Sequence, residues 1–464
     1  MKKTLIYILA TIVLIFSAAF LYIKTDTHIA FIDNYAENFS NNLFNLKLFF
    51  ETKKQEKETG EEAPDENEIN QNIENEENVA QPDTAPEETP VTPSPEPLEK
   101  LNIATPGKHD ISQRDITKIT KTTKKDKSGE SIEILTKNLS LSRDPIALSD
   151  AATSQYQKFM DGILCVRENV MTLYKNNGQI RWEHQTTISN PVLKTTDSYI
   201  LIWEKDKNKA IVYKNNKELY VIQTNDKILN GYISPVGECV LVCEKPYYKG
   251  EVMVYNKSGE EIFKRSFGSE NVLCAAISSS RRLAISLMSI GEQVNSRVAF
   301  FDINKSDEDN SIMYQNTIIY DLEFNQSSLI AYADDKMICL NQNAKQDWVF
   351  PYSDKTLDHY QKDIKDNRLL MFDNQNNGEL SVISLAGREL RKISTDIIPD
   401  YGDINNGYII YNDERNLYLI RMDGTLLAKY QASRDIHKAY FIDSDNILIV
   451  YNSSIEFLHT EKGE

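Results

Sequence analysis

The sequence contains none of the short motifs that mark the common enzyme families. It has no GxSxG nucleophile elbow, no phosphate-binding loop of the Walker type and no GxGxxG dinucleotide fingerprint. Its histidines show no ligand spacing such as HExxH. They are His28, His109, His184, His359, His437 and His459. We therefore predict no catalytic residue, no cofactor and no metal site, and we expect locally satisfied histidines in a protein that is not an enzyme.

Cysteine is scarce and shows no zinc-binding pattern. The five cysteines lie in apolar, strand-like runs such as CVLVCE, and none belongs to a CxxC pair. They are Cys165, Cys239, Cys243, Cys274 and Cys339. Cys239 and Cys243 would share one face of a strand, but their Cα atoms would lie about 13 Å apart, too far for a disulfide unless the strand bends sharply. We predict buried thiols that pack as small hydrophobic groups.

One uncharged apolar run stands near the N-terminus. It extends from Thr4 to Ile23, TLIYILATIVLIFSAAFLYI, and follows two lysines. As a helix this run would be about 30 Å long, enough to cross a bilayer. We predict that residues 1–25 form a transmembrane anchor with a cytoplasmic N-terminus and the rest of the chain outside. A cleavable signal peptide is the alternative, because small residues stand at 17–19, but the apolar run continues beyond them.

Residues 26–50 keep enough Phe, Leu and Ile for an amphipathic juxtamembrane helix. Such a helix would rest on the membrane surface or pair with a copy of itself. A simple helical continuation of the anchor is the other interpretation. The sequence alone does not decide between them.

The negative charge of the chain is concentrated in one stretch. The net charge is -17, and the segment from Glu51 to Lys100 holds 16 acidic and 4 basic residues, a net -12. This segment has almost no aromatic residues and a Pro-rich end, so it cannot bury enough apolar surface to offset its ordering entropy. We predict that residues 51–130 are a disordered, extended stalk. Nothing in this charge distribution favours nucleic acid as a partner.

A Lys-rich segment, DITKITKTTKKDKSG, closes the predicted stalk. Its lysines are Lys118, Lys121, Lys124, Lys125 and Lys127. Screened attraction to an anionic lipid or wall polymer is one interpretation of this segment. A merely solvated charge run at the edge of a domain is the other.

From about residue 130 the sequence changes to short β-rich runs of five to eight residues in units of about 40, the length of a propeller blade. The clearest mark is a hairpin with an aromatic or apolar residue, a small residue and an aromatic residue at intervals of four. The copies are YKNNGQIRW from Tyr174 to Trp182, YNKSGEEIF from Tyr255 to Phe263 and LNQNAKQDW from Leu340 to Trp348. Further copies are marked by Tyr213 and Lys217, by Gly387 and by Gly424. Each needs Gly or Asn at positive φ in its turn.

These units predict an all-β domain over residues 131–464, a β-propeller of about eight blades with seven as the alternative. The predicted blades are Ser154 to Thr187, Ser189 to Lys227, Leu229 to Gly268, Ser269 to Gln315, Asn316 to Lys355, Leu357 to Asp396, Ile397 to Ile436 and the shorter His437 to Thr460. The last unit has only three strands. We expect the isolated run SIEILTKNLSLS, Ser131 to Ser142, to supply its missing outer strand and so remove the open sheet edges.

The Gly-x3-Trp hairpin in repeats of this length resembles the tryptophan-docking repeats of quinoprotein-like (PQQ-like) β-propellers, over about residues 131–460. Only Trp182 and Trp348 keep the docking residue as Trp. The layout of anchor, acidic stalk and propeller is similar to a family of Gram-positive membrane proteins with PQQ-like propellers. The resemblance implies a fold and a location rather than an activity.

Quinoprotein dehydrogenases hold a quinone over a tryptophan, ligate Ca²⁺ with acidic and amide side chains, and often carry adjacent cysteines. This sequence has no Cys-Cys pair and no CxxCH motif. Its acidic clusters stand where turns are expected, at positions that favour Asp for backbone reasons. They are Asp307, Glu308 and Asp309, and Asp443 with Asp445.

The function that the sequence favours is a membrane-anchored, extracytoplasmic binding or scaffolding module of the cell envelope. Its expected partners are the membrane, through the N-terminal helix, and an envelope protein or glycan at the loops or channel mouth. A degenerate quinoprotein-type oxidoreductase is the alternative. An Asp, Asn and Arg cluster around a Trp-floored channel would favour that alternative, whereas tryptophans packed between blades would argue against it.

Overall fold

The computed structural model describes the propeller and short parts of the chain before it. The described residues are 102–103, 116–125, 131–133 and 135–462, without 292, 306, 354, 375 and 376. They are all strand, turn or loop, and none of them belongs to a helix long and apolar enough to cross a membrane. The predicted anchor, the juxtamembrane helix and the stalk up to residue 101 lie outside the described residues.

Each of the first four blades contains four consecutive antiparallel strands. Blade 1 consists of β7 (Gln155–Phe159), β8 (Gly162–Arg167), β9 (Val170–Lys175) and β10 (Ile180–Gln185). Blade 2 consists of β11 (Pro191–Thr195), β12 (Tyr199–Glu204), β13 (Lys209–Lys214) and β14 (Lys217–Gln223). Blade 3 consists of β15 (Ile228–Ile233), β16 (Cys239–Cys243), β17 (Gly250–Tyr255) and β18 (Glu261–Phe267). Blade 4 consists of β19 (Asn271–Ile277), β20 (Arg282–Ile290), β21 (Val294–Asp302) and β22 (Glu308–Gln315).

Three of the remaining blades repeat this order, and the eighth differs in one strand. Blade 5 consists of β23 (Ile319–Asn325), β24 (Ser328–Ala333), β25 (Lys336–Asn341) and β26 (Gln346–Pro351). Blade 6 consists of β27 (Thr356–Lys362), β28 (Arg368–Asn374), β29 (Asn377–Ile383) and β30 (Glu389–Ser394). Blade 7 consists of β31 (Tyr401–Asn405), β32 (Tyr408–Asn412), β33 (Asn416–Arg421) and β34 (Leu426–Gln431). Blade 8 consists of β35 (Lys438–Phe441), β36 (Asn446–Val450), β37 (Ser454–Lys462) and β5 (Lys137–Leu141).

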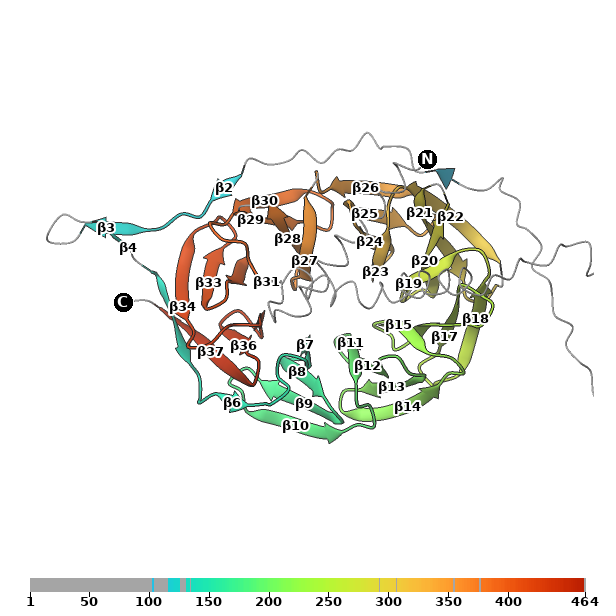
Figure 1. Ribbon diagram of the computed structural model, residues 1–464, viewed down its shortest axis with the longest axis horizontal. Coiled ribbons are helices and arrows are strands. Elements are labelled where there is room, and N and C mark those ends of the chain that lie inside the picture. The colour runs from blue at the N-terminus through green and yellow to red at the C-terminus, as the bar shows by residue number, and fades with distance from the viewer. Residues whose placement is uncertain are drawn as a thin grey trace, which may run out of the picture.

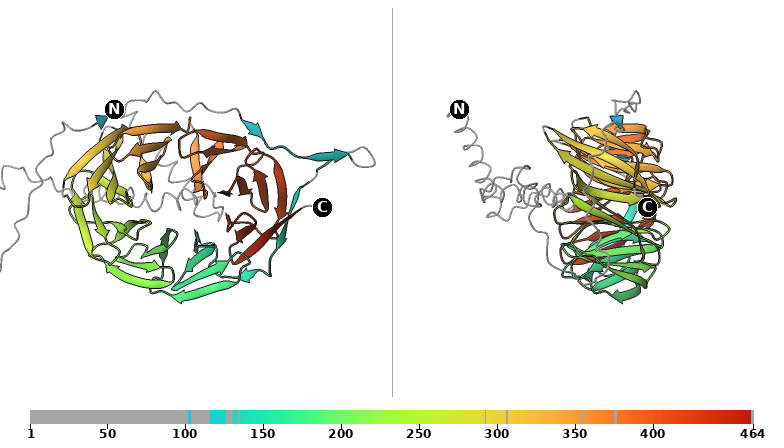
Figure 2. Two further views of the ribbon diagram at one scale, coloured as in Figure 1. Left: turned by 180° about the vertical axis from the view of Figure 1, so that it is seen from behind. Right: turned by 90° about the vertical axis from the view of Figure 1, so that its right-hand side faces the viewer.

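The eight sheets form an oval ring around a central channel (Figure 1), and the ring is flat when seen from its side (Figure 2). The first strand of each blade lies nearest the channel and the fourth lies on the outer rim. The prediction of eight blades is confirmed, and the alternative of seven is wrong. The blade boundaries expected from the repeat differ from those observed by a few residues, because the repeat includes the loops between blades.

The ring is closed by a strand from before the first blade. β5 pairs antiparallel with β37, with Leu141 opposite Leu458 and Lys137 opposite Lys462. A second short strand, β6 (Ile146–Ala147), also pairs with β37. The predicted closing run from 131 to 142 is thus confirmed in its second half. Its first part is instead β4 (Ser131–Glu133), which forms a hairpin with β3 (Thr123–Lys125) that extends away from the ring (Figure 1).

Part of the segment expected to be disordered adds strands to the outer rim. β1 (Asn102–Ile103) pairs parallel with β22, and β2 (Thr117–Lys118) pairs parallel with β30. Thr120 then exchanges backbone hydrogen bonds with blade 7, to Gly424 at 2.9 Å and from Leu426 at 3.0 Å. The prediction of disorder was based only on the small apolar surface that the segment can bury by itself, and it left out backbone hydrogen bonds to the propeller. An open sheet edge supplies backbone partners to an extended chain whatever its side chains are.

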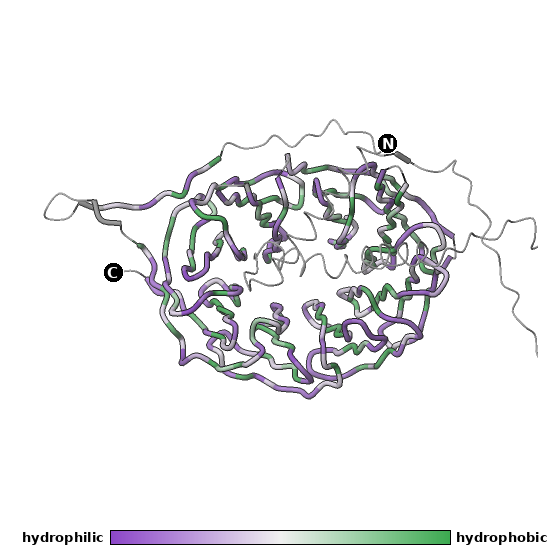
Figure 3. Tube along the Cα trace, viewed as in Figure 1, coloured by the Kyte–Doolittle hydropathy of each residue, from purple (hydrophilic) through white to green (hydrophobic). Residues whose placement is uncertain are grey.

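The hydrophobic core is divided among the contacts between blades. Each of eight clusters of buried side chains in the described residues joins two neighbouring blades, including blades 8 and 1. Figure 3 shows hydrophobic residues concentrated within the blades and hydrophilic residues along much of the outer rim. All five cysteines are buried and free of disulfides, as predicted. Each blade is therefore stabilised mainly by its two neighbours.

The predicted hairpin turns bring one blade against the next. Gly387, in the turn between β29 and β30, has φ 75°, and a Cβ there would lie 2.5 Å from the ring of Trp348 in blade 5. The Trp348 indole N–H donates to the Leu385 carbonyl in the same blade 6 turn at 3.2 Å. Gly259 meets Tyr220 of blade 2 in the same way. Glycine is needed at these turns for its backbone angle and for the space that the docked ring occupies.

We predict that Gly387→Ala destabilises the propeller more than Gly407→Ala does. Both glycines have positive φ, but a Cβ at Gly407 meets nothing within 4 Å. The shared backbone strain therefore cancels, and the difference in free energy of unfolding, about 1–3 kcal/mol, measures the clash with Trp348. Denaturant unfolding of both variants tests this. An equal loss of free energy of unfolding in both variants would mean that the contact between Trp348 and Gly387 does not stabilise the propeller.

We also predict that the closing strand decides the stability of the ring. A chain that begins at residue 148 lacks β5 and β6 and leaves β37 with an open edge, whereas a chain that begins at residue 135 keeps both strands. Thermal unfolding should show a melting temperature lower by at least about 5 °C for the shorter chain. Both chains lack residues 116–125, so this comparison isolates the closure. The same melting temperature for both would contradict the prediction.

Candidate functional site

The first strands, which line the channel, are more polar than the strands behind them. β7 has the sequence QYQKF and β27 the sequence TLDHYQK, whereas the second strands β8 (GILCVR) and β16 (CVLVC) are apolar and buried. A second strand has a blade against each face and a sheet neighbour on each side. A first strand has one free edge at the channel, so polar side chains remain solvated there.

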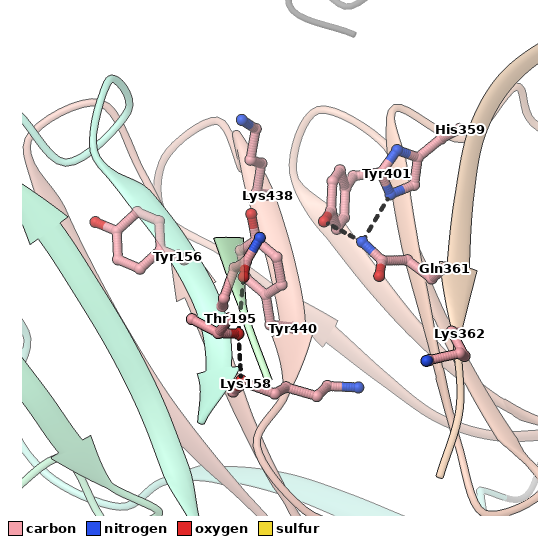
Figure 4. A pocket seen from close by; sticks show the side chains of 10 residues that line it. Tyr156, Lys158, Thr195, His359, Gln361, Lys362, Tyr401, Lys438 and Tyr440 are labelled. Carbon is pink, nitrogen blue, oxygen red and sulfur yellow. Dashed lines mark hydrogen bonds between the residues drawn. The ribbon is translucent and has the colours of Figure 1, made fainter. Parts of the chain in front are cut away.

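Among the described residues, the channel holds at least two cavities, each with a volume of about 400 Å³. We call the one between blades 1, 2, 6, 7 and 8 the first cavity (Figure 4). It is lined by Tyr156, Gln157, Lys158, Thr195, His359, Gln361, Lys362, Tyr401, Lys438 and Tyr440. The other, the second cavity, shares Gln157, Thr195 and Lys362 with it and extends toward blades 3, 4 and 5. All eight first strands contribute to one cavity or the other.

A buried carboxylate on β31 connects three blades behind the first cavity. The side chain of Asp403 is 1% exposed and accepts hydrogen bonds from the backbone N–H groups of Ile404 and Phe441, each at 2.8 Å. Lys158 of blade 1 approaches the same carboxylate at 2.9 Å. The carboxylate therefore fixes Lys158 in place, while 32% of the lysine side chain stays exposed.

The opposite wall of the first cavity is a neutral hydrogen-bonded group. The Gln361 side-chain amide donates to the Tyr401 hydroxyl at 2.8 Å and lies 3.1 Å from Nε2 of His359. The His359 and Tyr401 rings are 4.2 Å apart (Figure 4). Burial, reinforced by the positive charge of Lys438, lowers the pKa of His359 to about 3. The imidazole is therefore neutral near pH 7 and accepts at Nε2 with its proton on Nδ1.

Glu323 of β23 lies in the wall of the second cavity and holds two cations of blade 6. Arg368 approaches it at 3.1 Å, and Lys362 forms an ion pair with it. Arg368 also donates to the Tyr332 hydroxyl at 3.3 Å. Burial disfavours the charged carboxylate, but the two cations outweigh burial, so the pKa of Glu323 lies below its ordinary value.

Asp321, two residues earlier, makes a contact across the channel. It accepts a hydrogen bond from the Tyr360 hydroxyl of blade 6, and Lys194 of blade 2 lies 3.9 Å away. Tyr360 stacks on Tyr332 with ring centroids 3.9 Å apart. Blades 2, 5 and 6 are thereby joined through one carboxylate. The channel carboxylates thus have fixed donors, an arrangement suited to holding side chains in position for recognition.

The described residues contain no group of three or more His, Cys, Asp or Glu side chains that could hold a metal ion. The acidic groups noted in the sequence have other partners. Glu308 pairs with Arg297 at 2.6 Å, and Asp443 accepts the backbone N–H groups of Asp445 and Asn446, the turn role predicted for it.

Neither tryptophan of the docking repeats lies in the channel. Trp348 belongs to the cluster between blades 5 and 6, and Trp182 packs against the cluster between blades 1 and 2. The residues that line the first cavity include tyrosines but no tryptophan. Both tryptophans therefore pack between blades in the described part of the chain, the arrangement that argues against the alternative of a quinoprotein-type oxidoreductase.

Sequence reasoning named no site residue, and it missed the side chains that the channel brings together. It interpreted His359 only as a locally satisfied histidine, whereas His359 lines the first cavity. The signal available in the sequence was the polar character of first strands such as QYQKF and TLDHYQK. Which of their side chains share a cavity depends on the ring, because they come from blades at opposite ends of the sequence.

Two carboxyl groups near the interface of blades 6 and 7 have raised pKa values. Asp358 lies at a bulge in β27, and Asp400 precedes β31. Burial, with Asp373 and Asp400 nearby, raises the pKa of Asp358 to about 6. Burial, with Asp413 and Glu414 nearby, raises the pKa of Asp400 to about 6 as well.

Comparison with known proteins identifies a family and a solved structure with a similar fold. A family model described as a family of unknown function, DUF5711, matches residues 140–459. The computationally designed Ika8 protein is 13% identical, with 69% of this chain and 98% of that chain covered and a TM-score of 0.50. BamB from Moraxella catarrhalis is 11% identical, with 69% and 99% covered and a TM-score of 0.46. No curated protein matches the chain. At 13% identity the likeness to Ika8 shows the fold alone.

We predict that Asp400→Asn stabilises the folded protein at pH 8 and has little effect at pH 4. A raised pKa in the folded state means that the carboxyl group contributes stability below about pH 4 and loses it as the pH rises through about 6. Asparagine avoids the buried charge, so the gain at pH 8 should be on the order of 1–2 kcal/mol. The lowered pKa of His359 makes stability fall as the pH falls, but this contribution is the same in the variant and the parent, so it does not affect their difference.

Denaturant unfolding at both pH values measures this effect. Asp197→Asn, at an exposed turn, is the matched control and should change stability equally little at pH 4 and pH 8. An Asp400→Asn gain that is the same at both pH values would contradict the assignment.

Proposed function

This chain belongs to the DUF5711 family, whose function is unknown, and we propose that it is a membrane-anchored binding or scaffolding module with its propeller outside the cytoplasm. The observation that carries the proposal is the closed ring with a channel of positioned polar side chains around two cavities. Because the side chains of such a ring are already held in place, little conformational entropy is lost when a ligand binds, which favours binding.

The contacts in the channel support a role without catalysis. Asp403, Glu323 and Asp321 each hold a cation or hydroxyl donor of another blade, so these carboxylates serve to join blades. His359 lies beside an amide and a tyrosine, and its lowered pKa keeps it below the range useful to a general base near pH 7.

The proposed location rests on the N-terminal sequence. An uncharged run of 20 residues follows two lysines, and an acidic segment separates it from the propeller. We infer that this run anchors the chain in the cell membrane of a Gram-positive envelope and that the acidic segment holds the propeller away from the bilayer. An envelope protein or glycan would then reach the channel or the loops.

We predict that proteinase added to intact, wall-stripped cells removes or trims the propeller, followed with an antibody against the C-terminus. A propeller outside the membrane is accessible to the proteinase, while a cytoplasmic marker protein stays intact as the control. Full protection of the propeller, with digestion only after lysis, would reverse the orientation and remove the basis of the envelope proposal.

A further inference from the structure

We propose that the first cavity binds an anionic saccharide, a sugar unit that carries a phosphate or carboxylate group. This inference deepens the proposed function, on which it rests, because it names a ligand class for the same channel. It depends on the charge of the cavity wall, on how its lysines are held, and on the aromatic and polar groups between them.

The charge of the first cavity is opposite to that of the chain. Its described lining includes three lysines, Lys158, Lys362 and Lys438, and no Asp or Glu, whereas the chain carries a net charge of -17. The lining of the second cavity contains three carboxylates, among them Asp321 and Glu323, together with two lysines, Lys194 and Lys362. A cavity whose charged lining groups are all positive and whose walls have a low dielectric constant attracts an anion and repels a cation.

Two of the lysines are positioned from behind by buried or half-buried carboxylates. Asp403 holds Lys158 but also accepts two backbone N–H groups, so its charge is shared among several donors. Glu323 holds Lys362, whose side chain is 45% exposed, and also pairs with Arg368. Each ammonium group carries three N–H donors, so both lysines retain donors for a ligand.

The lysines stand at different depths of the cavity. Lys438 is the first residue of β35, whereas Lys362 is the last residue of β27 and Lys158 stands near the end of β7. Figure 4 shows these three lysines approaching from different sides, with Tyr401, Tyr440 and the amide of Gln361 between them. A ligand that bridges the cavity therefore meets ammonium groups around its periphery and rings and amides along its body.

The groups between the lysines suit a sugar. The ring centroids of Tyr401 and Tyr440 lie 5.1 Å apart, and those of Tyr156 and Tyr440 lie 6.0 Å apart. The three tyrosines are 5–8% exposed, so together they give the cavity a small, rigid aromatic surface. Thr195 and Gln157 are joined at 2.8 Å and add hydroxyl and amide groups. A volume of about 400 Å³ is within the range of small-molecule sites and large enough for one or two sugar rings.

The neutral state of His359 fits a site in which the lysines supply the positive charge and the uncharged side chains contact the sugar. With its pKa near 3, the imidazole adds no positive charge, and recognition of an anion depends on the lysines alone. Binding of glucuronate, whose carboxylate is fully ionised over this range, should then change little between pH 6 and pH 8, whereas glucose 6-phosphate gains negative charge as its phosphate loses its second proton near pH 6. A site that relied on a protonated imidazole would weaken over this range.

The test uses the full chain, purified in detergent, and isothermal titration with four probes. Glucose 6-phosphate and glucuronate carry the two kinds of anion on a sugar, glucose is the uncharged match, and inorganic phosphate has charge without a ring. We expect binding of at least one charged sugar, roughly tenfold weaker binding of glucose and of phosphate, and weakening at high salt. The two charged sugars distinguish a phosphate from a carboxylate source.

Variants locate the binding in the first cavity. Lys438→Gln should weaken binding of the charged sugar roughly tenfold, and Lys438→Arg should retain it. Lys257→Gln, the same change at an exposed turn between β17 and β18, is the matched control and should have no effect. If Lys438→Gln does not fold, Lys362→Met replaces it, because Arg368 still pairs with the Glu323 left behind.

Absence of binding by both charged sugars, equal binding of glucose, or an unchanged affinity in the folded lysine variants would overturn the proposal. These results are separate from the orientation of the propeller. No sugar binding by an exposed propeller would refute the ligand class and leave the scaffold role. Sugar binding by a propeller that is protected in intact cells would keep the site and refute the proposed location.

Discussion

The pairing of β5 with β37 is the interaction on which the rest of this structure depends. Every cluster of the core lies between two blades, so a blade with only one neighbour would expose half of its apolar surface. One sheet that contains strands from both ends of the propeller makes the last blade dependent on the first residues of the domain. Opening the ring would expose the edge of β37 and loosen its contacts with blade 1.

The closed ring also makes the channel possible. Asp403, Phe441 and Lys158 belong to three consecutive blades around the closure, and their hydrogen bonds and ion pair require that blades 7, 8 and 1 hold one fixed arrangement. On the other side, Asp321 joins blades 5, 6 and 2. Such networks are worth little unless every member is satisfied, so the stability of the ring and the geometry of the site depend on each other.

Local sequence signals predicted the repeat because each has a physical cause within a few residues. The hairpin turns need a left-handed residue, and Gly178, Ala344 and Gly387 stand at such positions with positive φ. An aromatic side chain follows the turn residue by four positions because, as Trp348 shows, it packs against the turn glycine of the next blade. The strands β1 and β2 that are added to the rim carry no such signal, since backbone hydrogen bonding to an open edge makes few demands on side chains.

The sequence by itself determined the repeat of four strands in about 40 residues, a count of about eight blades with seven left open, and the second half of the run that closes the ring, because alternation, turn residues and the 40-residue period act locally. Only the tertiary structure decided which side chains form a site. Lys158, His359 and Lys438 come from blades 1, 6 and 8, and their neighbourhood follows from ring closure rather than from any spacing along the chain. The difference in charge between the two cavities, lysines alone in the first and lysines with carboxylates in the second, likewise appears only when the first strands are brought together.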